Sequence, residues 1–163
     1  MNMIRLKTAV VLGGALKIGA LIGGADVKDA ELLSHFGENV GLAFQLQDDI
    51  LDVYGDPEKF GKQVGGDIIS NKKTYLQIKA LELASKQQVA ELDSWTALKE
   101  FDAVEKIEAV TSIYNALNVR QHAEEVMQQY ADKAFDALDV INLPEEHKQY
   151  LRNFADGLLV REN

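Results

Sequence analysis

The chain has 163 residues, of which 47% are hydrophobic, so it is long enough to bury the core of one domain and too apolar to be disordered. Its formal net charge of -9 excludes the basic surface with which proteins usually bind nucleic acids. It has no Cys, which excludes disulfides and thiolate metal sites and fits a reducing, cytoplasmic environment. Few prolines among many Ala, Leu, Glu, Lys and Gln residues predict an all-α fold.

The first predicted helix covers residues 3–22 and ends at Gly23 and Gly24, a common helix stop. Its basic opening, apolar stretch and small residues imitate a signal peptide. Lys17 interrupts the apolar stretch, however, and leaves it shorter than the roughly 20 residues that a membrane-spanning helix needs. We favour a tightly packed, buried helix whose glycines allow close approach to a neighbour, with export as the alternative.

A second, longer helix is predicted to begin near Asp26 or Asp29, either of which can cap it, and to end near Tyr54, with Gly55 just beyond. Residues 56–73 then lack helical periodicity and collect glycines and lysines, which predicts an ordered loop. Because so long a loop is uncommon unless it has a function, we expect it to belong to a site.

The rest of the chain predicts four more helices. They cover residues 74–92, 104–117, 119–140 and 144–160. Pro144 opens the last one, since proline suits a first helical turn, and Trp95 is expected to anchor packing from a connection. No repeat, low-complexity tract or linker divides the sequence. We therefore predict one domain over residues 1–163, an antiparallel bundle of about six helices.

Three carboxylates gather in the last two turns of the second helix, within the stretch FQLQDDILDVYGD of residues 44–56. Asp48 and Asp52 are four residues apart and Asp49 and Asp52 three apart, so a helix places all three on one side. There they repel one another and also meet the negative end of the helix macrodipole, at a cost of roughly 0.3 to 1 kcal/mol per charge. Helix stability therefore does not explain the arrangement.

Two explanations remain for this acidic cluster. The ordinary one is a solvated acidic face. Apolar neighbours such as Ile50 and Leu51 instead indicate a helix that is buried over much of its circumference. Partly buried carboxylates need a cation, and oxygen ligands without Cys or His nearby select Mg²⁺. His122 and His147 are remote in sequence, and we interpret both as surface residues.

Magnesium usually binds through one or two carboxylates together with the phosphates of a substrate. Lysines are then needed to neutralise the remaining phosphate charge. Lys62 and Lys72 in the loop are candidates, as is Lys7, next to Thr8 on the first helix. A magnesium-bridged diphosphate site is the interpretation that uses all of these residues.

The stretches GLAFQLQDDILDVYGD and FGKQVGGDIISNKKTY resemble the second aspartate-rich motif and the adjoining loop of the trans-isoprenyl diphosphate synthases, which include farnesyl and geranylgeranyl diphosphate synthase. MIRLKTAVVLGGAL resembles the helix that precedes this motif. A DDxxD alone is weakly specific, but the order KT, FQ, DDxxD, GK, GGD and KxT within residues 1–80 is specific. The remaining residues are compatible with the family's less distinctive C-terminal helices.

The resemblance implies an isoprenoid-synthase-like fold and a prenyltransferase of isoprenoid biosynthesis. In that family an allylic diphosphate loses its diphosphate, isopentenyl diphosphate attacks the resulting carbocation, and a proton is removed. By resemblance, Asp48, Asp49 and Asp52 hold Mg²⁺ against the allylic diphosphate, and Asp48 is the expected direct ligand. Metal and lysines stabilise the charge that develops on the leaving group.

Seven further residues match positions that bind substrate or act in catalysis in that family. They are Lys7, Thr8, Phe44, Gln45, Lys62, Lys72 and Arg161. The lysines and the arginine are expected to bind diphosphate, whereas the threonine, the glutamine and the phenylalanine are expected beside the developing cation. Asp67 is either a turn residue or a support for the loop lysines, and Lys59 and Lys73 are expected to be solvated.

The family's members are longer and carry a first aspartate-rich motif upstream of the segment seen here, and residues 1–163 contain no second DDxxD. The chain resembles their C-terminal half. We expect it to be inactive alone and to form a homo-oligomer or pair with a missing N-terminal half through uncovered apolar faces. The alternatives are a non-catalytic helical subunit of a heteromeric prenyl synthase and a class I terpene cyclase fragment, over which the GK, GGD and KxT loop favours the synthase.

Overall fold

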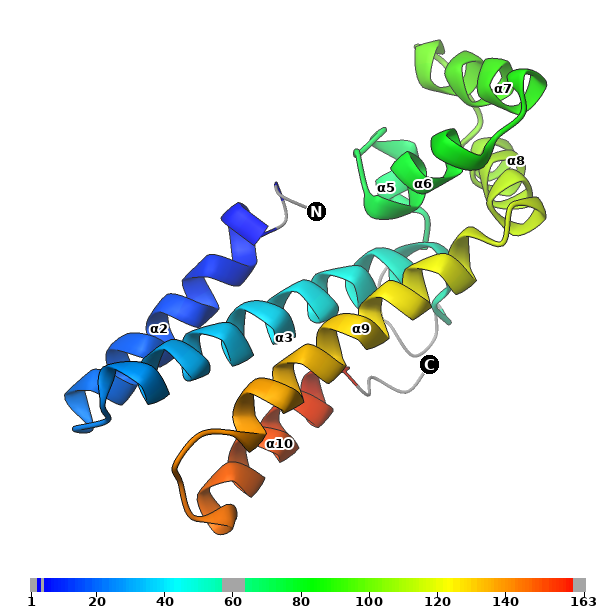
Figure 1. Cartoon of the computed structure of the whole chain (residues 1–163). Coiled ribbons are helices and arrows are strands. Elements are labelled where there is room, and N and C mark those ends of the chain that lie inside the picture. The colour runs from blue at the N-terminus through cyan, green and yellow to red at the C-terminus, as the bar shows by residue number, and fades with distance from the viewer. Residues whose placement is uncertain (1–2, 4, 57–63, 160–163) are drawn as a thin grey trace. The chain divides into compact units, whose positions relative to one another are not determined.

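The computed structural model describes residues 3, 5–56 and 64–159, and this part of the chain is helical without strands (Figure 1), which confirms the predicted all-α class. Its elements in chain order are the π-helical turn η1 (Arg5–Ala9) and the α-helices α2 (Val10–Ile22), α3 (Val27–Tyr54), α5 (Gly66–Ile69), α6 (Tyr75–Leu83), α7 (Lys86–Ala97), α8 (Ala103–Ala116), α9 (Val119–Asp139) and α10 (Glu145–Leu159).

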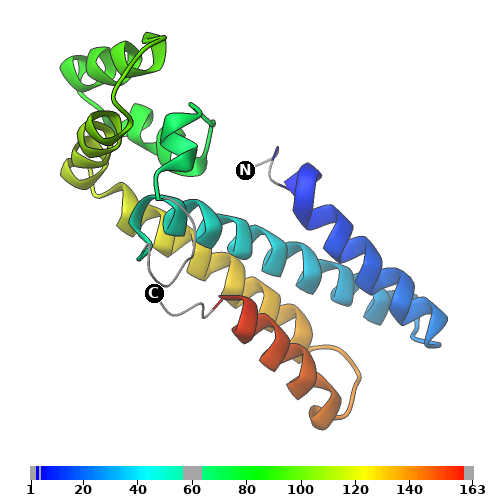
Figure 2. The ribbon, with the colours of Figure 1, turned by 180° about the vertical axis from the view of Figure 1, so that it is seen from behind.

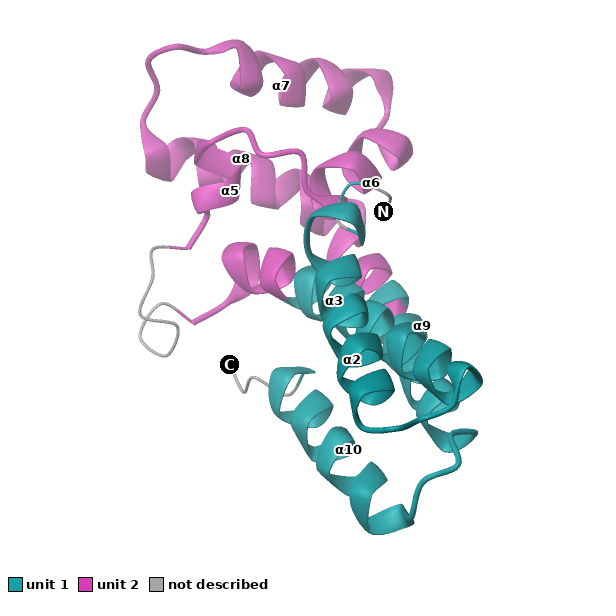
Figure 3. Cartoon of the chain, turned by 90° about the vertical axis from the view of Figure 1, so that its left-hand side faces the viewer, with its two compact units in different colours: residues 1–47, 126–162 teal, residues 48–125, 163 magenta. Residues whose placement is uncertain are grey.

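The chain divides into two compact units (Figure 3). The first comprises residues 1–47 and 126–162, and the second comprises residues 48–125 and 163. Helices α3 and α9 run from one unit into the other, so the first unit combines two stretches that are far apart in the sequence. One domain over residues 1–163 stays a prediction.

In the first unit α2 runs back along α3, and α10 runs back along α9 (Figures 1 and 2). Glycine lets α3 approach the start of α2 closely, because a Cβ added at Gly41 would lie 2.9 Å from the Cα of Ala9. The prediction concerned glycines of the first helix, and Gly13 on α2 agrees with it, since a Cβ there would lie 2.7 Å from the backbone oxygen of Ser34. The prediction of a buried first helix is wrong for the described chain, since Val11 and Ile22 are 69% and 83% exposed.

The core of the first unit lies between α3, α9 and α10. Its buried members are Leu33, Phe36, Val40, Ala134, Leu138, Ile141 and Ala155. Burial of each large side chain among them contributes about 1.5–3 kcal/mol. None of the helices within the described ranges combines the length and the apolar character that crossing a membrane requires.

In the second unit the predicted helix over residues 74–92 is two helices. Thr74 caps α6 by accepting the N–H of Gln77 at 3.2 Å, and Ser85 forms a capping box with Gln88 that starts α7. The helical winding therefore stops at residues 84–85, and a new helix begins after them. Because α7 extends to Ala97, Trp95 lies on a helix, and its prediction as part of a connection is wrong.

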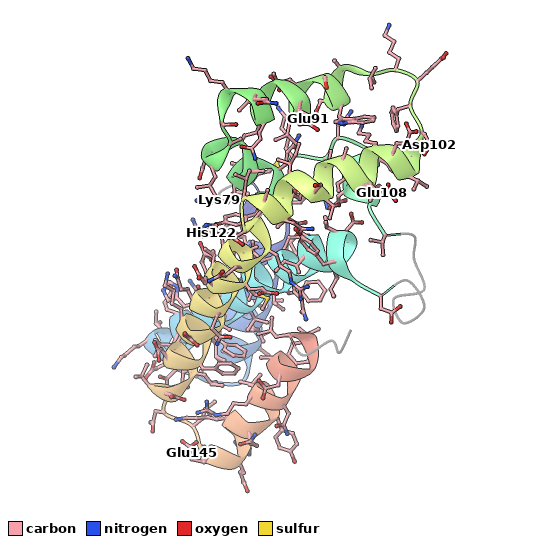
Figure 4. All side chains as sticks on the ribbon, turned by 90° about the vertical axis from the view of Figure 1, so that its right-hand side faces the viewer. Lys79, Glu91, Asp102, Glu108, His122 and Glu145 are labelled. Atoms are coloured by element: carbon pink, nitrogen blue, oxygen red, sulfur yellow. The ribbon has the colours of Figure 1, made fainter. Side chains whose placement is uncertain are left out.

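Helix α8 is capped by Asp102, whose Oδ1 accepts the N–H groups of Val104 and Glu105 at 2.8 and 3.0 Å. Figure 4 labels Asp102 at this end and Glu108 farther along the same helix. The buried residues of the helix are Lys106, Val110, Ile113 and Tyr114. Val104, at the start of the helix predicted over residues 104–117, is 62% exposed, so the buried face of α8 leaves it out and includes a lysine instead.

Candidate functional site

Asp49 lies near the end of α3, and only 2% of it is exposed. Its Oδ1 accepts a hydrogen bond from Lys72 Nζ at 3.4 Å, and its Oδ2 accepts the N–H of Tyr75 at 3.4 Å. A carboxylate this deeply buried requires a cation and hydrogen-bond donors. Asp49 therefore joins the end of α3 to the segment that starts α6.

Asp52 joins the same end of α3 to α5. Its Oδ2 accepts the N–H of Asp67 at 2.8 Å, and its backbone carbonyl accepts the N–H of Gly65 at 2.5 Å. Burial raises the pKa of the Asp52 carboxyl; the Asp67 N–H lowers it, and the charges of Asp67 and Asp48 raise it. The net pKa is raised, so a cation bound beside Asp52 would relieve both desolvation and repulsion.

The two glycines before Asp67 occupy crowded positions for different physical reasons. Gly65 has φ 87°, and a Cβ there would lie 2.5 Å from Cδ1 of Ile107. Gly66 opens α5, and a Cβ there would lie 3.3 Å from Oδ1 of Asp52. The turn therefore requires glycine at position 65, whereas a side chain at position 66 would crowd the Asp52 carboxylate.

Lys72 provides the positive charge of this cluster. Its Nζ lies 2.6 Å from Oδ2 of Asp67 and 3.4 Å from Oδ1 of Asp49, and 40% of its side chain is exposed. Burial lowers the pKa of Lys72, but the hydrogen bond and charge of Asp67, together with Asp49, outweigh burial and raise it. Lys72 is thus a fixed cation with an exposed part of its side chain, as phosphate recognition requires.

Asp48 is half-buried and lies one helix turn before Asp52. Its charge contributes to the raised pKa of Asp52, which agrees with the expectation that both carboxylates share one side of the helix. Among the described residues no three His or carboxylate side chains enclose a point as in a closed metal site. Magnesium does not need such an enclosure, because it keeps waters and uses one or two carboxylates.

Four of the other predicted site residues belong to the first unit. Lys7 is exposed and Thr8 is half-buried, and both lie in the π-helical turn η1. Phe44 and Gln45 are half-buried on α3. The remaining predicted site residues, Lys62 and Arg161, lie outside the described residues, as does Lys59. Lys73 is exposed, as expected.

The sequence profile of polyprenyl synthetases matches residues 1–117, a range that includes the acidic cluster and the lysine-containing segment of residues 56–73. The chain belongs to the polyprenyl synthetase family. It is 36% identical to a short chain isoprenyl diphosphate synthase of Methanothermobacter thermautotrophicus, over 100% of this chain and 49% of that protein.

Solved structures of polyprenyl synthetases resemble this chain closely. A geranylgeranyl pyrophosphate synthase has a TM-score of 0.89 and 41% identity, over 99% of this chain and 50% of that one. The geranylgeranyl pyrophosphate synthase of Corynebacterium glutamicum, complexed with isoprenyl diphosphate and magnesium, has a TM-score of 0.85 and 32% identity, over 97% and 45%. The chain spans about half the length of these relatives.

Two residues beside the acidic cluster of this polyprenyl synthetase chain were not predicted from its sequence. Asn71 precedes Lys72, and its side-chain oxygen accepts a hydrogen bond from Lys106 Nζ at 2.7 Å. Lys106 precedes Val110 by four residues and Ile113 by seven, which is the spacing of one helix face. That spacing could have revealed Lys106 if a lysine had been accepted among the buried positions of the predicted helix.

Proposed function

We propose that this chain supplies the second magnesium- and diphosphate-binding half of a prenyltransferase that joins an allylic diphosphate to isopentenyl diphosphate. The observation that carries the proposal is a cluster of charged residues at the end of α3. In it Lys72 contacts the carboxylates of Asp67 and Asp49, and the backbone N–H of Asp67 donates to the carboxylate of Asp52. Family membership supports it, as does the magnesium and isoprenyl diphosphate complex of the Corynebacterium relative.

The donor set fits Mg²⁺, because Asp48 and Asp52 are half-buried oxygen donors at an acidic helix end, where charge repulsion favours a bound cation. We assign Asp48 as the direct ligand, with Asp52 and Asp49 completing the acidic set. Bound Mg²⁺ would neutralise charge on the diphosphate as it leaves. Asp49 also keeps Lys72 and the start of α6 against α3.

The chain's basic and polar residues have the following proposed roles. Lys72 donates to the diphosphate oxygens, together with the other diphosphate-binding residues Lys7, Lys62 and Arg161. Thr8 and Gln45 present their oxygens to the developing carbocation, and the ring of Phe44 lies next to them. No covalent intermediate with the protein is needed, because the residues act by charge and orientation.

We also propose that the isolated chain does not form product and acts only with a complementary half, since it carries one aspartate-rich motif. A second candidate is a non-catalytic subunit that binds a prenyl synthase partner. The apolar side chains exposed along α2 favour it, Ile18 and Ile22 being 60% and 83% exposed.

Calorimetry of the full chain with pyrophosphate, with and without Mg²⁺, tests the site. We expect uptake that requires Mg²⁺ and that Asp48→Asn abolishes, whereas Asp136→Asn, the same change at an exposed position of α9, leaves it intact. Uptake that is independent of both Mg²⁺ and Asp48 contradicts the proposal.

Radiolabelled isopentenyl diphosphate with allylic primers, given to the chain with and without an added N-terminal half of a relative, tests the reaction. Product formed only with the added half supports a catalytic half-site. Product from the chain alone overturns the proposed incompleteness, and no product in either mixture favours the non-catalytic subunit.

A further inference from the structure

Lys106 of α8 is buried along its whole length, with 1% of the residue exposed. Its ammonium donates to Oδ1 of Asn71 at 2.7 Å and to the carbonyl of Ile69 at 3.5 Å, and it lies 4.2 Å from the ring centroid of Phe101. Burial lowers its pKa. No carboxylate of the described chain pairs with it, so its burial depends on the 69–71 segment.

Asn71 has φ 53°, in the left-handed region that asparagine tolerates better than most residues. Both polar atoms of its side-chain amide are hydrogen-bonded, because Oδ1 accepts from Lys106 and Nδ2 donates to the carbonyl of Thr96 at 3.3 Å. The next residue is Lys72. The conformation fixed at Asn71 therefore sets the direction in which the backbone carries Lys72 toward Asp67.

The space around Lys106 decides how it can act. The adjoining cavity measures about 20 Å³ and is lined by Asn71, Lys72, Gln77 and Trp95 among others. That volume holds about one water molecule. A diphosphate or a prenyl chain does not fit, so Lys106 acts on the site through Asn71 and not by touching a substrate.

We propose that Lys106 is a positioning residue of the diphosphate site, which holds Asn71 in its left-handed conformation and thereby keeps Lys72 against Asp67 and Asp49. The contact is independent of the reaction, and only its importance for diphosphate binding rests on the proposed function. The same clamp orders the start of α6, since the N–H of Lys72 donates to the carbonyl of Asp67 at 2.9 Å and the N–H of Thr74 to the carbonyl of Lys72 at 2.9 Å.

The main test is Lys106→Met in the full chain, a change that removes the ammonium and keeps most of the volume. Amide hydrogen exchange at Lys72 and Thr74 should become about tenfold faster, because local opening becomes easier. The NMR signal of the Lys72 ammonium should shift as its contact with Asp67 loosens. Magnesium-dependent pyrophosphate affinity should fall about tenfold.

Lys148→Met is the matched control. Lys148 is also buried, at 5% exposure, and donates to the carbonyl of Asp139 at 2.8 Å, but it belongs to the first unit. It should lower stability while leaving exchange at Lys72, the Lys72 ammonium signal and pyrophosphate binding unchanged. Equal effects of both methionine variants on these three measurements would overturn the proposal.

A second pair of variants tests the clamp from its other side, should Lys106→Met not fold. Asn71→Gly accepts a positive φ but lacks the acceptor, whereas Asn71→Asp keeps an acceptor for Lys106. We expect the glycine variant to loosen Lys72 and the aspartate variant to keep it in place. Equal exchange rates at Lys72 in the two variants would overturn the proposal.

The proposed function and the clamp fail in different ways. If the unmodified chain takes up no pyrophosphate with Mg²⁺, the proposed function fails, while the exchange rates and the Lys72 signal still decide the role of Lys106. If the unmodified chain binds pyrophosphate and Lys106→Met binds it equally well, the clamp is overturned and the proposed function stands.

Discussion

The ammonium of Lys72 lies 2.6 Å from a carboxylate oxygen of Asp67, a residue that also donates its backbone N–H to Asp52. One aspartate therefore connects the lysine to the acidic end of α3. Lys72 is kept charged, since its pKa is raised despite partial burial. A negatively charged ligand that approaches this end of α3 meets a cation that is already oriented.

Replacing Lys72 by methionine should weaken magnesium-dependent pyrophosphate binding by about tenfold to hundredfold, because a hydrogen bond to a charged group contributes roughly 1.5–3 kcal/mol. Lys73→Met is the matched control, since Lys73 is the exposed neighbour. Calorimetry at one fixed ionic strength measures both. Equal losses in the two variants would mean that only net charge matters and would contradict a specific role for Lys72.

Gly65→Ala should destabilise the chain by about 2–4 kcal/mol, from the left-handed backbone and from overpacking. The reason is local: φ is 87°, and the new methyl group would lie 2.5 Å from Cδ1 of Ile107. Gly19→Ala serves as control, because a Cβ at this position of α2 meets nothing within 4 Å. That variant should instead gain about 0.5–1 kcal/mol. Urea unfolding followed by circular dichroism measures both, and a neutral Gly65→Ala would contradict the expected strain.

Tyr54→Phe should stabilise the chain by about 1 kcal/mol, since a buried hydroxyl without a partner is costly. The Tyr54 hydroxyl has no hydrogen-bond partner among the described residues, and burial raises the pKa of Tyr54 to about 12. The folded state therefore holds this proton more tightly than the unfolded state, whose tyrosine pKa is about 10. The resulting stability is fully present below the unfolded pKa and is lost as pH rises toward the folded one.

Urea unfolding at pH values below and within that window checks the linkage, with absorbance reporting tyrosinate. The unmodified chain should lose more stability across the window than Tyr54→Phe does. Tyr150→Phe, at a position that is 75% exposed, should behave like the unmodified chain. If Tyr54→Phe keeps the full pH dependence, burial of the Tyr54 hydroxyl is not the cause of the loss of stability at high pH.

The apolar face of α2 should cause self-association of the full chain at micromolar concentration. Ile18 is 60% exposed there, and Ile18→Glu should shift the population toward monomer. Val104→Glu adds the same charge at a residue that is 62% exposed on α8 and should change little. Size-exclusion chromatography with light scattering measures the masses, and a monodisperse monomer from the unmodified chain would contradict the prediction.

Much of the fold follows from the sequence because its signals are local. The run from the Asp26–Asp29 capping region to Gly55 predicts α3, and Pro144 marks the start of α10. The break between α6 and α7 escaped prediction because strong helix formers surround it and Ser85 is a single capping residue. A good N-cap inside a helix-rich stretch outweighs the surrounding propensity.

The candidate site follows from the sequence less completely. Asp49 and Lys72 are predicted by charge crowding and by the resemblance, and the structure brings them together at 3.4 Å. Lys106 escapes prediction because lysines are usually exposed, and its distance from Asn71 in the sequence hides their contact. Long-range contacts of this kind depend on how helices pack, which a single sequence does not specify.

The π-helical turn at Arg5–Ala9 widens the first turn by one residue before the regular α2 begins. Each residue of an α-helix advances the azimuth by about 100°. Deleting a single residue from this turn and restoring regular α-helical winding would therefore rotate Lys7 and Thr8 about the axis of α2, while the apolar positions of α2 keep their phase. The irregular turn thus sets the direction of these two side chains independently of the helix that follows.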